Sequence, residues 1–302
     1  MRHDPLMQTE VGKARELGSS PTLCRLEKRA TRSDVVALNR VLVEQFIASQ
    51  TSLPDELVLD IDASDIPLHG DQELKEFHAY YDSHCYLPLY VFCGKAMLAC
   101  VLRRSRIDGA RHSAALIKLL VSRLRQTWPD VRIIVRGDSG FCRQRLIRWC
   151  ERRGVGYVIG LARNARLQHQ VAGWERLMEH HHAESGVKQR LIREFTYAAQ
   201  TWDRSRRVIT RLEFGSQGNN PRFIVTNLDG GPTELYDGLY CLRELALAKT
   251  ELAKATSATI RVKLLKIGAA VVRNTRRIRI LLASHHPLRD VYFAAANNLD
   301  SP

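Results

Sequence analysis

The stretch Leu57-Val58-Leu59-Asp60-Ile61-Asp62-Ala63-Ser64-Asp65 decides the fold class of this 302-residue chain. Apolar residues alternate with Asp60 and Asp62, and a period of two predicts a β-strand. Because successive side chains of a strand point to opposite faces, both carboxylates lie on one face and the apolar residues on the other. Two acids on one face of a hydrophobic strand indicate a role beyond packing.

The residues that follow this strand alternate between strand and helix patterns. Apolar runs at 87–93 and 97–103 predict two strands, and residues 112–128 form an amphipathic helical pattern. A buried-type strand at 130–135 leads into Arg136-Gly137-Asp138-Ser139-Gly140-Phe141. A helix at 143–153 and a strand at 156–161 come next. Three strands followed by helix, strand, helix and strand indicate an α/β fold.

The pattern changes beyond residue 164 and predicts further segments. A polar helix at 171–182 precedes three β-like runs, and a long helix covers 233–254. Residues 252–289 contain nine Lys or Arg and no acid, and 260–267 with 277–282 could form a basic ribbon. We therefore divide the chain into an N-terminal remnant with a helix (1–55), a core (56–166), a β-rich insertion (167–228, with runs at 189–197, 206–214 and 222–226), a core helix (229–258) and a basic tail (259–302).

The charge of the chain indicates its partners. With 46 Lys and Arg against 32 Asp and Glu, the formal net charge is +14. Such an excess favours phosphate polyanions or acidic surfaces and does not define a fold. No stretch approaches 18 consecutive apolar residues, and the N-terminus has no leader-like apolar segment. We expect a soluble, cytoplasmic protein without a membrane partner.

Asp62 and Asp138 follow two of the predicted strands and are the candidate catalytic pair. Carboxylates at the ends of neighbouring strands can share Mg²⁺, which prefers hard oxygen ligands. Two such ions activate an attacking hydroxyl and stabilise the leaving oxygen in an in-line displacement at phosphorus. The alternative is structural: Asp62 as a solvated edge residue and Asp138 as a turn residue before a helix.

The sequence strongly resembles the DDE transposases of bacterial insertion sequences, above all the group numbered thirteen-eighty. The resemblance covers nearly the whole chain and rests on these residues: 59–65, His69-Gly70, Tyr80-Tyr81-Asp82, 87–111, Arg136-Gly137-Asp138-Ser139-Gly140-Phe141 and 259–269.

The resemblance implies both a fold and an activity. The implied fold is a ribonuclease H-like mixed sheet flanked by helices, with a β-rich insertion and a basic C-terminal segment. The implied activity uses Mg²⁺ (or Mn²⁺) to nick DNA at transposon ends and to join the freed 3′ hydroxyl to target DNA, within a synaptic homo-oligomer near the bacterial nucleoid. Asp62 and Asp138 would be the first two catalytic acids and metal ligands. Asp60 is a rival metal ligand, and Asp65 a weaker one.

The third acid of the family pattern is missing. Related families carry Tyr, Arg, Glu and Lys on the helix after the insertion, and the DNA-contacting Tyr240, Arg243 and Lys254 fit this spacing. Leu247 occupies the Glu position. Glu244 and Glu251 flank it, but only a shifted or rebuilt helix would aim either one at the metals. We expect an internal deletion near this helix and a missing N-terminal DNA-recognition region.

A cluster of arginines follows the second acid. Arg143, Arg145 and Arg148 belong to it, and Glu151 is the only acid between residues 143 and 166. We interpret these arginines as phosphate contacts, because like charges repel unless a polyanion is present. The alternative is a solvated helix face. Two other functions remain open for the chain: a non-catalytic DNA-binding remnant of a transposase, and a stand-alone metal-dependent nuclease.

Overall fold

The computed structural model describes residues 8, 16–216, 218–240, 269–273 and 278–282. The chain divides into two compact units. One contains residues 36–240 and the other contains residues 1–35 with 241–302. The second unit includes helix α2 (Ser20–Arg29) and an antiparallel ribbon of β13 (Ala269–Arg273) and β14 (Ile278–Leu282). The ribbon strand expected at 277–282 is present as β14, whereas the one expected at 260–267 lies outside the described residues.

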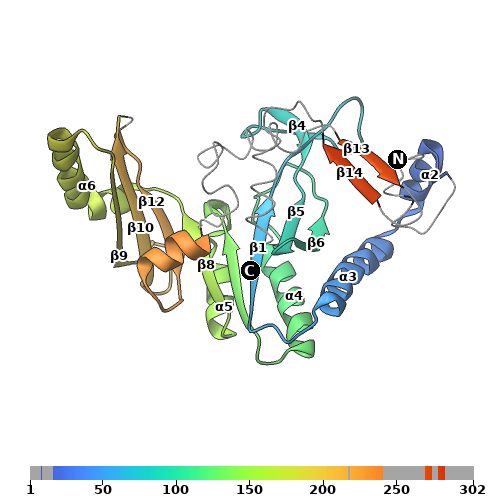
Figure 1. Cartoon of the computed structure of the whole chain (residues 1–302), viewed down its shortest axis with the longest axis horizontal. Helices are drawn as coiled ribbons and strands as arrows, with labels where there is room; N and C mark the ends of the chain where they lie inside the picture. Colours follow the sequence, from blue (N-terminus) through green and yellow to red (C-terminus); the bar gives the residue numbers. More distant parts are fainter. Residues whose placement is uncertain (1–7, 9–15, 217, 241–268, 274–277, 283–302) are drawn as a thin grey trace. The chain divides into compact units, whose positions relative to one another are not determined.

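A mixed sheet forms the centre of the first unit (Figure 1). Strand β1 (Glu56–Ala63) lies between β5 (Leu89–Cys93), which runs antiparallel, and β7 (Arg132–Gly137), which runs parallel. Beyond them lie β6 (Ala96–Val101) and β8 (Gly156–Leu161), so the order is β6-β5-β1-β7-β8. Three antiparallel strands followed by two parallel ones, with helices in the crossovers, make a ribonuclease H-like fold. The fold class expected from the sequence is confirmed.

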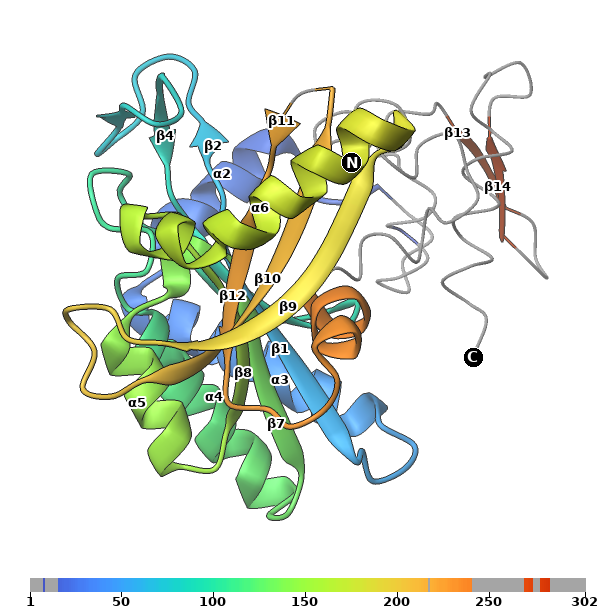
Figure 2. The same cartoon turned by 90° about the vertical axis from the view of Figure 1, so that its left-hand side faces the viewer.

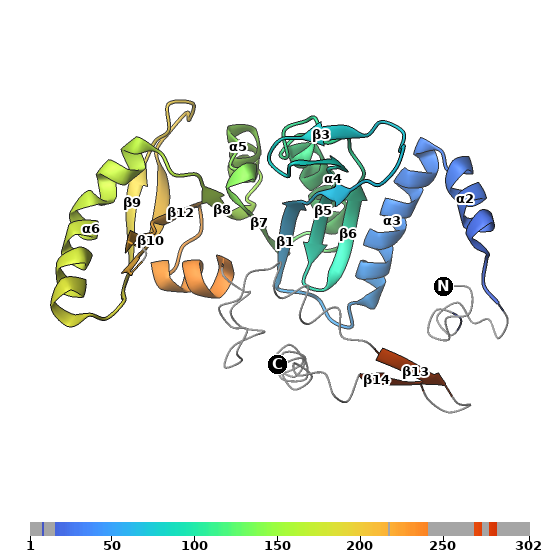
Figure 3. The same cartoon turned by 90° about the horizontal axis from the view of Figure 1, so that it is seen from above.

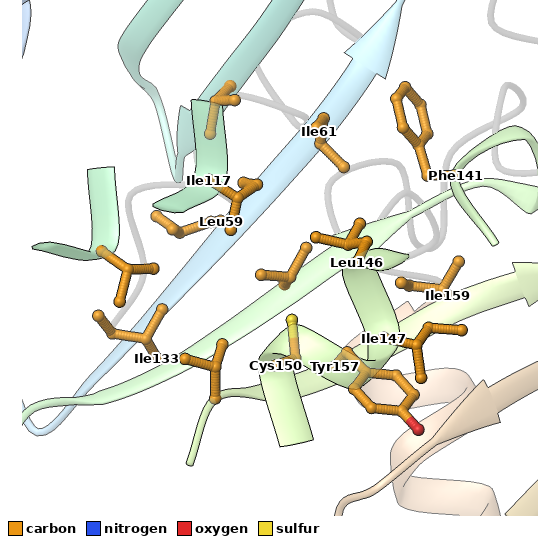
Figure 4. Close-up of a cluster of buried hydrophobic side chains, with 14 of the residues drawn as sticks. Leu59, Ile61, Ile117, Ile133, Phe141, Leu146, Ile147, Cys150, Tyr157 and Ile159 are labelled. Atoms are coloured by element: carbon orange, nitrogen blue, oxygen red, sulfur yellow. The ribbon is translucent and has the colours of Figure 1, made fainter. Parts of the chain in front are cut away.

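Helices cover the face of this sheet that the alternating apolar residues of β1 occupy. Leu57, Leu59 and Ile61 are buried, and they share one core with residues of α4 (Ser113–Thr127) and α5 (Gln144–Arg152). Figure 4 shows Ile117 of α4 close to Leu59, and Leu146 of α5 close to the strands. Helix α3 (Arg32–Ser49) adds Val43 and Phe46 to the same core. Asp60 and Asp62 therefore face the other side of the sheet.

The insertion extends the same sheet. Strand β12 (Arg222–Thr226) pairs antiparallel with β8, and β10 (Arg206–Gly215) continues from β12 to the short β11 (Gly218–Asn219). Strand β9 (Gln189–Tyr197) also pairs with β10, and helix α6 (Ala165–Ser185) lies along β9 and β10 (Figures 2 and 3). The sequence pattern did not predict that these strands join the central sheet.

A buried ion-pair network fastens the insertion to the core. Arg206 of β10 has a side chain only 2% exposed, and it donates to Glu151 of α5, whose side chain is 10% exposed (Nε to Oε1, 2.7 Å). Arg206 also donates to Asp203 (2.8 Å), and the hydroxyl of Tyr157 on β8 donates to Glu151 (3.0 Å). The network therefore joins α5, β8 and β10.

Two segments differ from the sequence expectation. A three-stranded sheet of β2 (Ile66–Pro67), β3 (Glu76–His78) and β4 (Ser83–Tyr86), which the pattern did not predict, lies between β1 and β5 in the chain. The helix expected at 233–254 is described only as the π-helical segment η2 (Glu234–Tyr240). Residues 241–254 lie outside the described part of the chain.

Candidate active site

Asp62 and Asp138 occupy corresponding positions on neighbouring strands. Strands β1 and β7 run parallel with Ile61 opposite Gly137, so Asp62 of β1 and Asp138, the first residue after β7, each follow this last pair. Each carboxylate is fixed by local hydrogen bonds. Asp138 begins the 3-10 turn η1 (Ser139–Phe141) and accepts from the Gly140 N–H (2.8 Å). Asp62 accepts from the Ala63 N–H (2.8 Å) and from the Ser64 hydroxyl (3.1 Å).

The environment of Asp138 disfavours its charged form. Burial and the negative charge of Asp62 raise the pKa of Asp138, against the hydrogen bonds from the Gly140 and Phe141 N–H groups. A raised carboxyl pKa means that the charged form is disfavoured, as expected for a carboxylate that is partly buried and has a second negative charge nearby. The site therefore has the electrostatic character of a place for positive charge.

Tyr81 belongs to the same site, although the sequence pattern gave it no role. Its hydroxyl donates to the backbone oxygen of Ala63 (3.3 Å). Burial, followed by the charges of Asp65, Asp62 and Asp138, raises the pKa of Tyr81. The hydroxyl is therefore held in its protonated, donating form beside the acids. Tyr80-Tyr81-Asp82 is one of the motifs of the family resemblance, but the short irregular hairpin that carries it has no periodic pattern from which the place of Tyr81 beside the acids could be predicted.

Asp60 is held by a different partner. Arg136 lies opposite Asp60 in the register of β1 and β7, and its guanidinium donates to both carboxylate oxygens. The side chains are 14% exposed for Arg136 and 30% exposed for Asp60. Arg136 also donates to the backbone oxygen of Leu239 in η2. Asp60 thus shares a face with Asp62, but a guanidinium already occupies both of its oxygens.

A hollow of about 280 Å³ adjoins Asp138. Its lining includes Gly160, Arg163, Arg222, Tyr236 and Tyr240. A Cβ at Gly160 would lie 2.7 Å from the Tyr240 hydroxyl, 2.7 Å from the Ser139 nitrogen and 3.0 Å from the Asp138 carbonyl carbon. Glycine at this position therefore lets Tyr240 and the Asp138 turn approach each other closely.

The residues expected around the third acid, on the helix after the insertion, lie outside the described part of the chain. This holds for Arg243, Glu244, Leu247, Glu251 and Lys254. Within the described ranges, no group of three or more His, Cys, Asp or Glu side chains could hold a metal ion. The acids of η2 have other partners: Asp237 pairs with Arg190 (2.5 Å), and Glu234 accepts from the Gly231 N–H (3.4 Å).

The donor set at Asp62 and Asp138 fits a divalent cation. Mg²⁺ is commonly bound by one or two carboxylates together with waters and substrate phosphates. Two hard oxygen donors at neighbouring strand positions, one with a raised pKa, meet that requirement. The donor set also fits Mn²⁺, because carboxylate and water ligands suit that ion as well.

The arginines expected to bind DNA lie on or next to α5 and differ in their partners. Arg143 pairs with Asp108 through contacts of 2.9 to 3.2 Å. Arg148 pairs with Asp203 (3.2 Å). Arg145 is exposed and lines two of the hollows beside α5. The three arginines thus differ in how far their charge is already compensated.

Comparison with known proteins defines the family. The ribonuclease H-like sheet, with carboxylates at the ends of the neighbouring strands β1 and β7, indicates the class of protein. A family model described as Transposase DDE domain group 1 matches residues 1–244 and 241–301. The chain therefore belongs to the DDE transposase domain family. No curated protein matches significantly.

A solved structure with partial similarity is the piggyBac transposase synaptic complex with hairpin DNA. It is 12% identical with a TM-score of 0.40, and the alignment covers 93% of this chain and 53% of that one. The chain thus spans about half the length of that transposase. Among the helices that the structure describes, none is long and apolar enough to cross a membrane.

Proposed function

We propose that this chain is an insertion-sequence transposase in which Asp62 and Asp138 bind Mg²⁺ or Mn²⁺ and support weak DNA nicking and strand transfer. The observation that carries the proposal is the parallel register of β1 and β7, which puts the two acids at corresponding positions. Family membership supports the reaction type. Assignment to the group numbered thirteen-eighty is part of the proposal and rests on the sequence motifs.

The proposed reaction is two displacements at phosphorus. In nicking, a water oxygen attacks the phosphorus, the bond to the 3′ oxygen breaks, and the products are a 5′ phosphate and a 3′ hydroxyl that takes up a proton. In strand transfer, that 3′ hydroxyl attacks a phosphodiester of target DNA and releases a new 3′ hydroxyl there. Bound divalent cations would activate the attacking oxygen and stabilise the leaving one.

The protein residues act by binding and orientation. Asp62 and Asp138 supply the carboxylate oxygens, and the local hydrogen bonds from residues 63, 64 and 140 keep them in place. Tyr81 presents a protonated hydroxyl next to them. Tyr240 lines the hollow at Asp138 and would contact a DNA phosphate there. The family resemblance assigns DNA contacts to Arg243 and Lys254 as well. Asp60 would act through Arg136 and not as a metal ligand.

We expect reduced activity because the third acid of the family pattern is missing. Changes to residues that merely support a metal ligand commonly cost about 10–100-fold in affinity or activity, and loss of a ligand should cost more. With Leu247 at the Glu position, only Glu244 or Glu251 could substitute. The family match also comes in two segments that meet at 241–244, which supports the internal deletion expected near this helix.

One observation favours a second candidate, a non-catalytic DNA-binding remnant. The described residues contain no cluster of three metal-ligating side chains. Such a protein would bind DNA through its basic surfaces and would not cut it.

The experiment that separates these functions uses labelled duplex DNA ends with Mg²⁺ or Mn²⁺. Nicking and transfer that disappear in Asp138→Ala would support the transposase. DNA binding without cleavage in either protein would overturn it in favour of the remnant. Glu244→Gln and Glu251→Gln form a matched pair, because the variant that loses activity identifies the substitute acid.

A further inference from the structure

Two adjoining hollows form a basic groove between α4 and α5. The first has a volume of about 340 Å³ and is lined by Lys118 of α4 and by Gln144, Arg145, Arg148, Trp149 and Arg152. The second, of about 490 Å³, shares Lys118 and Trp149 with the first and adds Arg125 and Arg153. The shared residues show that the two hollows adjoin each other, and we call them together the α4–α5 groove.

The groove lies on the helical face of the sheet. Both helices pack on the apolar side of β1 (Figures 1 and 4), whereas Asp60 and Asp62 point to the opposite side. The hydrogen bond from Arg136 to Leu239 places η2 on the side of the acids. The groove is therefore separate from the carboxylate site, and the chemistry at Asp62 and Asp138 does not account for its charge.

The groove carries a large excess of positive charge. Its lining contains six cationic side chains and no acid. Asp203 pairs with Arg148 but also accepts from the buried Arg206, so its single charge is shared. Arg125 donates to the backbone oxygens of Arg153 (2.7 Å) and Gly154 (3.0 Å), which are neutral acceptors. Clustering so many cations costs electrostatic repulsion unless an anion lies among them.

The spacing of the cations indicates what that anion is. Arg145, Arg148 and Arg152 are three and then four residues apart, so they form one stripe on α5. At 1.5 Å rise per residue the stripe is about 10 Å long. Phosphates of one DNA strand rise about 3.4 Å each along the helix axis, so the length of the stripe corresponds to the axial rise of about three nucleotides. Trp149 lines both hollows, with the Lys118 ammonium 5.9 Å from its ring centre.

The geometry points to the α4–α5 groove as a second contact with the backbone of duplex DNA, on the face of the sheet away from the carboxylates. This inference rests on the proposed function, because it takes DNA as the partner of the chain. It also distinguishes among the arginines around α5. Arg145 and Arg152 lie in the groove, whereas the charge of Arg143 is compensated by Asp108.

The test measures binding of a labelled duplex by the full chain across a range of KCl concentrations, in EDTA so that no cleavage occurs. Each phosphate contact contributes about 0.9 to the slope of log affinity against log salt. We expect the double variant Arg145→Ala with Arg152→Ala to have a shallower slope, by the contribution of about two phosphate contacts. The double variant Arg145→Lys with Arg152→Lys should keep the wild-type slope. Arg176→Ala, at an exposed position of α6 outside the groove, is the matched control and should leave the slope unchanged.

The outcomes separate this inference from the proposed function. A wild-type chain without salt-dependent DNA binding would overturn both. A chain that binds DNA with the same slope in the double alanine variant would overturn the groove alone. If the double alanine variant loses binding to phosphatidylserine vesicles but keeps its DNA binding, the inference about the groove would also be overturned, because the groove would then serve a membrane surface. Circular dichroism of each exposed-site variant checks that the fold is kept.

Discussion

Arg136 joins the carboxylate of Asp60 on the neighbouring strand to the backbone oxygen of Leu239, and in doing so it distinguishes Asp60 from Asp62. The two aspartates share one face of β1, so their exposure to the site would otherwise be equivalent. Because both oxygens of Asp60 accept from the guanidinium, Asp62 is the acid left for a cation beside Asp138. The same guanidinium fixes the end of η2, where Tyr240 lies.

Loss of the Asp60 carboxylate should therefore reduce stability. Asp60→Ala leaves the guanidinium of Arg136 largely buried without its charged acceptor, and we expect the free energy of unfolding to fall by about 1.5–3 kcal/mol. The measurement is urea unfolding at neutral pH. Glu56→Ala is the control, because Glu56 pairs with Arg132 at the surface of the same two strands and should contribute less than about 1 kcal/mol. Equal losses in the two variants would contradict the buried role of Asp60.

A methyl group at Gly160 should disturb the acid turn. In Gly160→Ala the new Cβ would come too close to the Ser139 nitrogen and the Tyr240 hydroxyl, and such overpacking costs about 1–3 kcal/mol. Thermal and urea unfolding measure the effect. The control is Gly173→Ala on α6, where no atom lies within 4 Å and alanine in a helix interior should stabilise by about 0.5–1 kcal/mol. A neutral Gly160→Ala would show that Tyr240 does not lie against this turn.

The network around Arg206 should make stability depend on pH. Burial opposes ionisation of Glu151, but hydrogen bonds from Arg206, Arg204 and Tyr157 hold its pKa below the ordinary value. Its contribution to stability is therefore complete above the unfolded-state pKa of about 4.3 and is lost as the pH falls through the lower folded-state value. Asp203, whose pKa is lowered to about 2 chiefly by Arg206, loses its contribution at still lower pH.

Substitutions in this network test that account. Arg206→Ala removes the buried charged partner of Glu151 and leaves its carboxylate with the exposed Arg204 and the Tyr157 hydroxyl, and we expect a loss of about 3–5 kcal/mol at pH 7. Arg204→Ala, which removes an exposed partner of the same carboxylate, should cost much less. In Glu151→Gln the decline of stability between pH 5 and pH 3 should be smaller than in the wild type. A pH profile unchanged by Glu151→Gln would contradict the assignment.

Part of the fold could be predicted from the sequence because its strands have strong periodic patterns. The alternation in 57–62 predicted β1 and its acidic face, and the apolar run before Arg136 predicted β7. The small sheet of β2, β3 and β4 could not be predicted, because strands of two to four residues are too short to show a period. The extension of the central sheet by β12 depends on pairing with β8, a contact between distant segments that local patterns do not encode.

The sequence predicted some residues of the candidate site but not their contacts. The motifs predicted Asp62 and Asp138 as the catalytic pair and left Asp60 as an alternative, because alternation gives both β1 acids the same face. The catalytic role of the pair stays a prediction. The distinction depends on Arg136, which lies 76 residues from Asp60 in the chain. Tyr81 belongs to the Tyr80-Tyr81-Asp82 motif of the resemblance, but its place near the acids could not be predicted, since it depends on the turn that follows β3.

Binding of Mn²⁺ to the full chain, measured by the electron paramagnetic resonance signal of the free ion, tests the central claim most directly. The account predicts that Asp62→Asn and Asp138→Asn each weaken Mn²⁺ binding by more than about 10-fold, because each removes a ligand. Asp60→Asn should stay within about threefold of the wild type. Undiminished Mn²⁺ binding by Asp138→Asn, or a loss in Asp60→Asn as large as in Asp62→Asn, would contradict it.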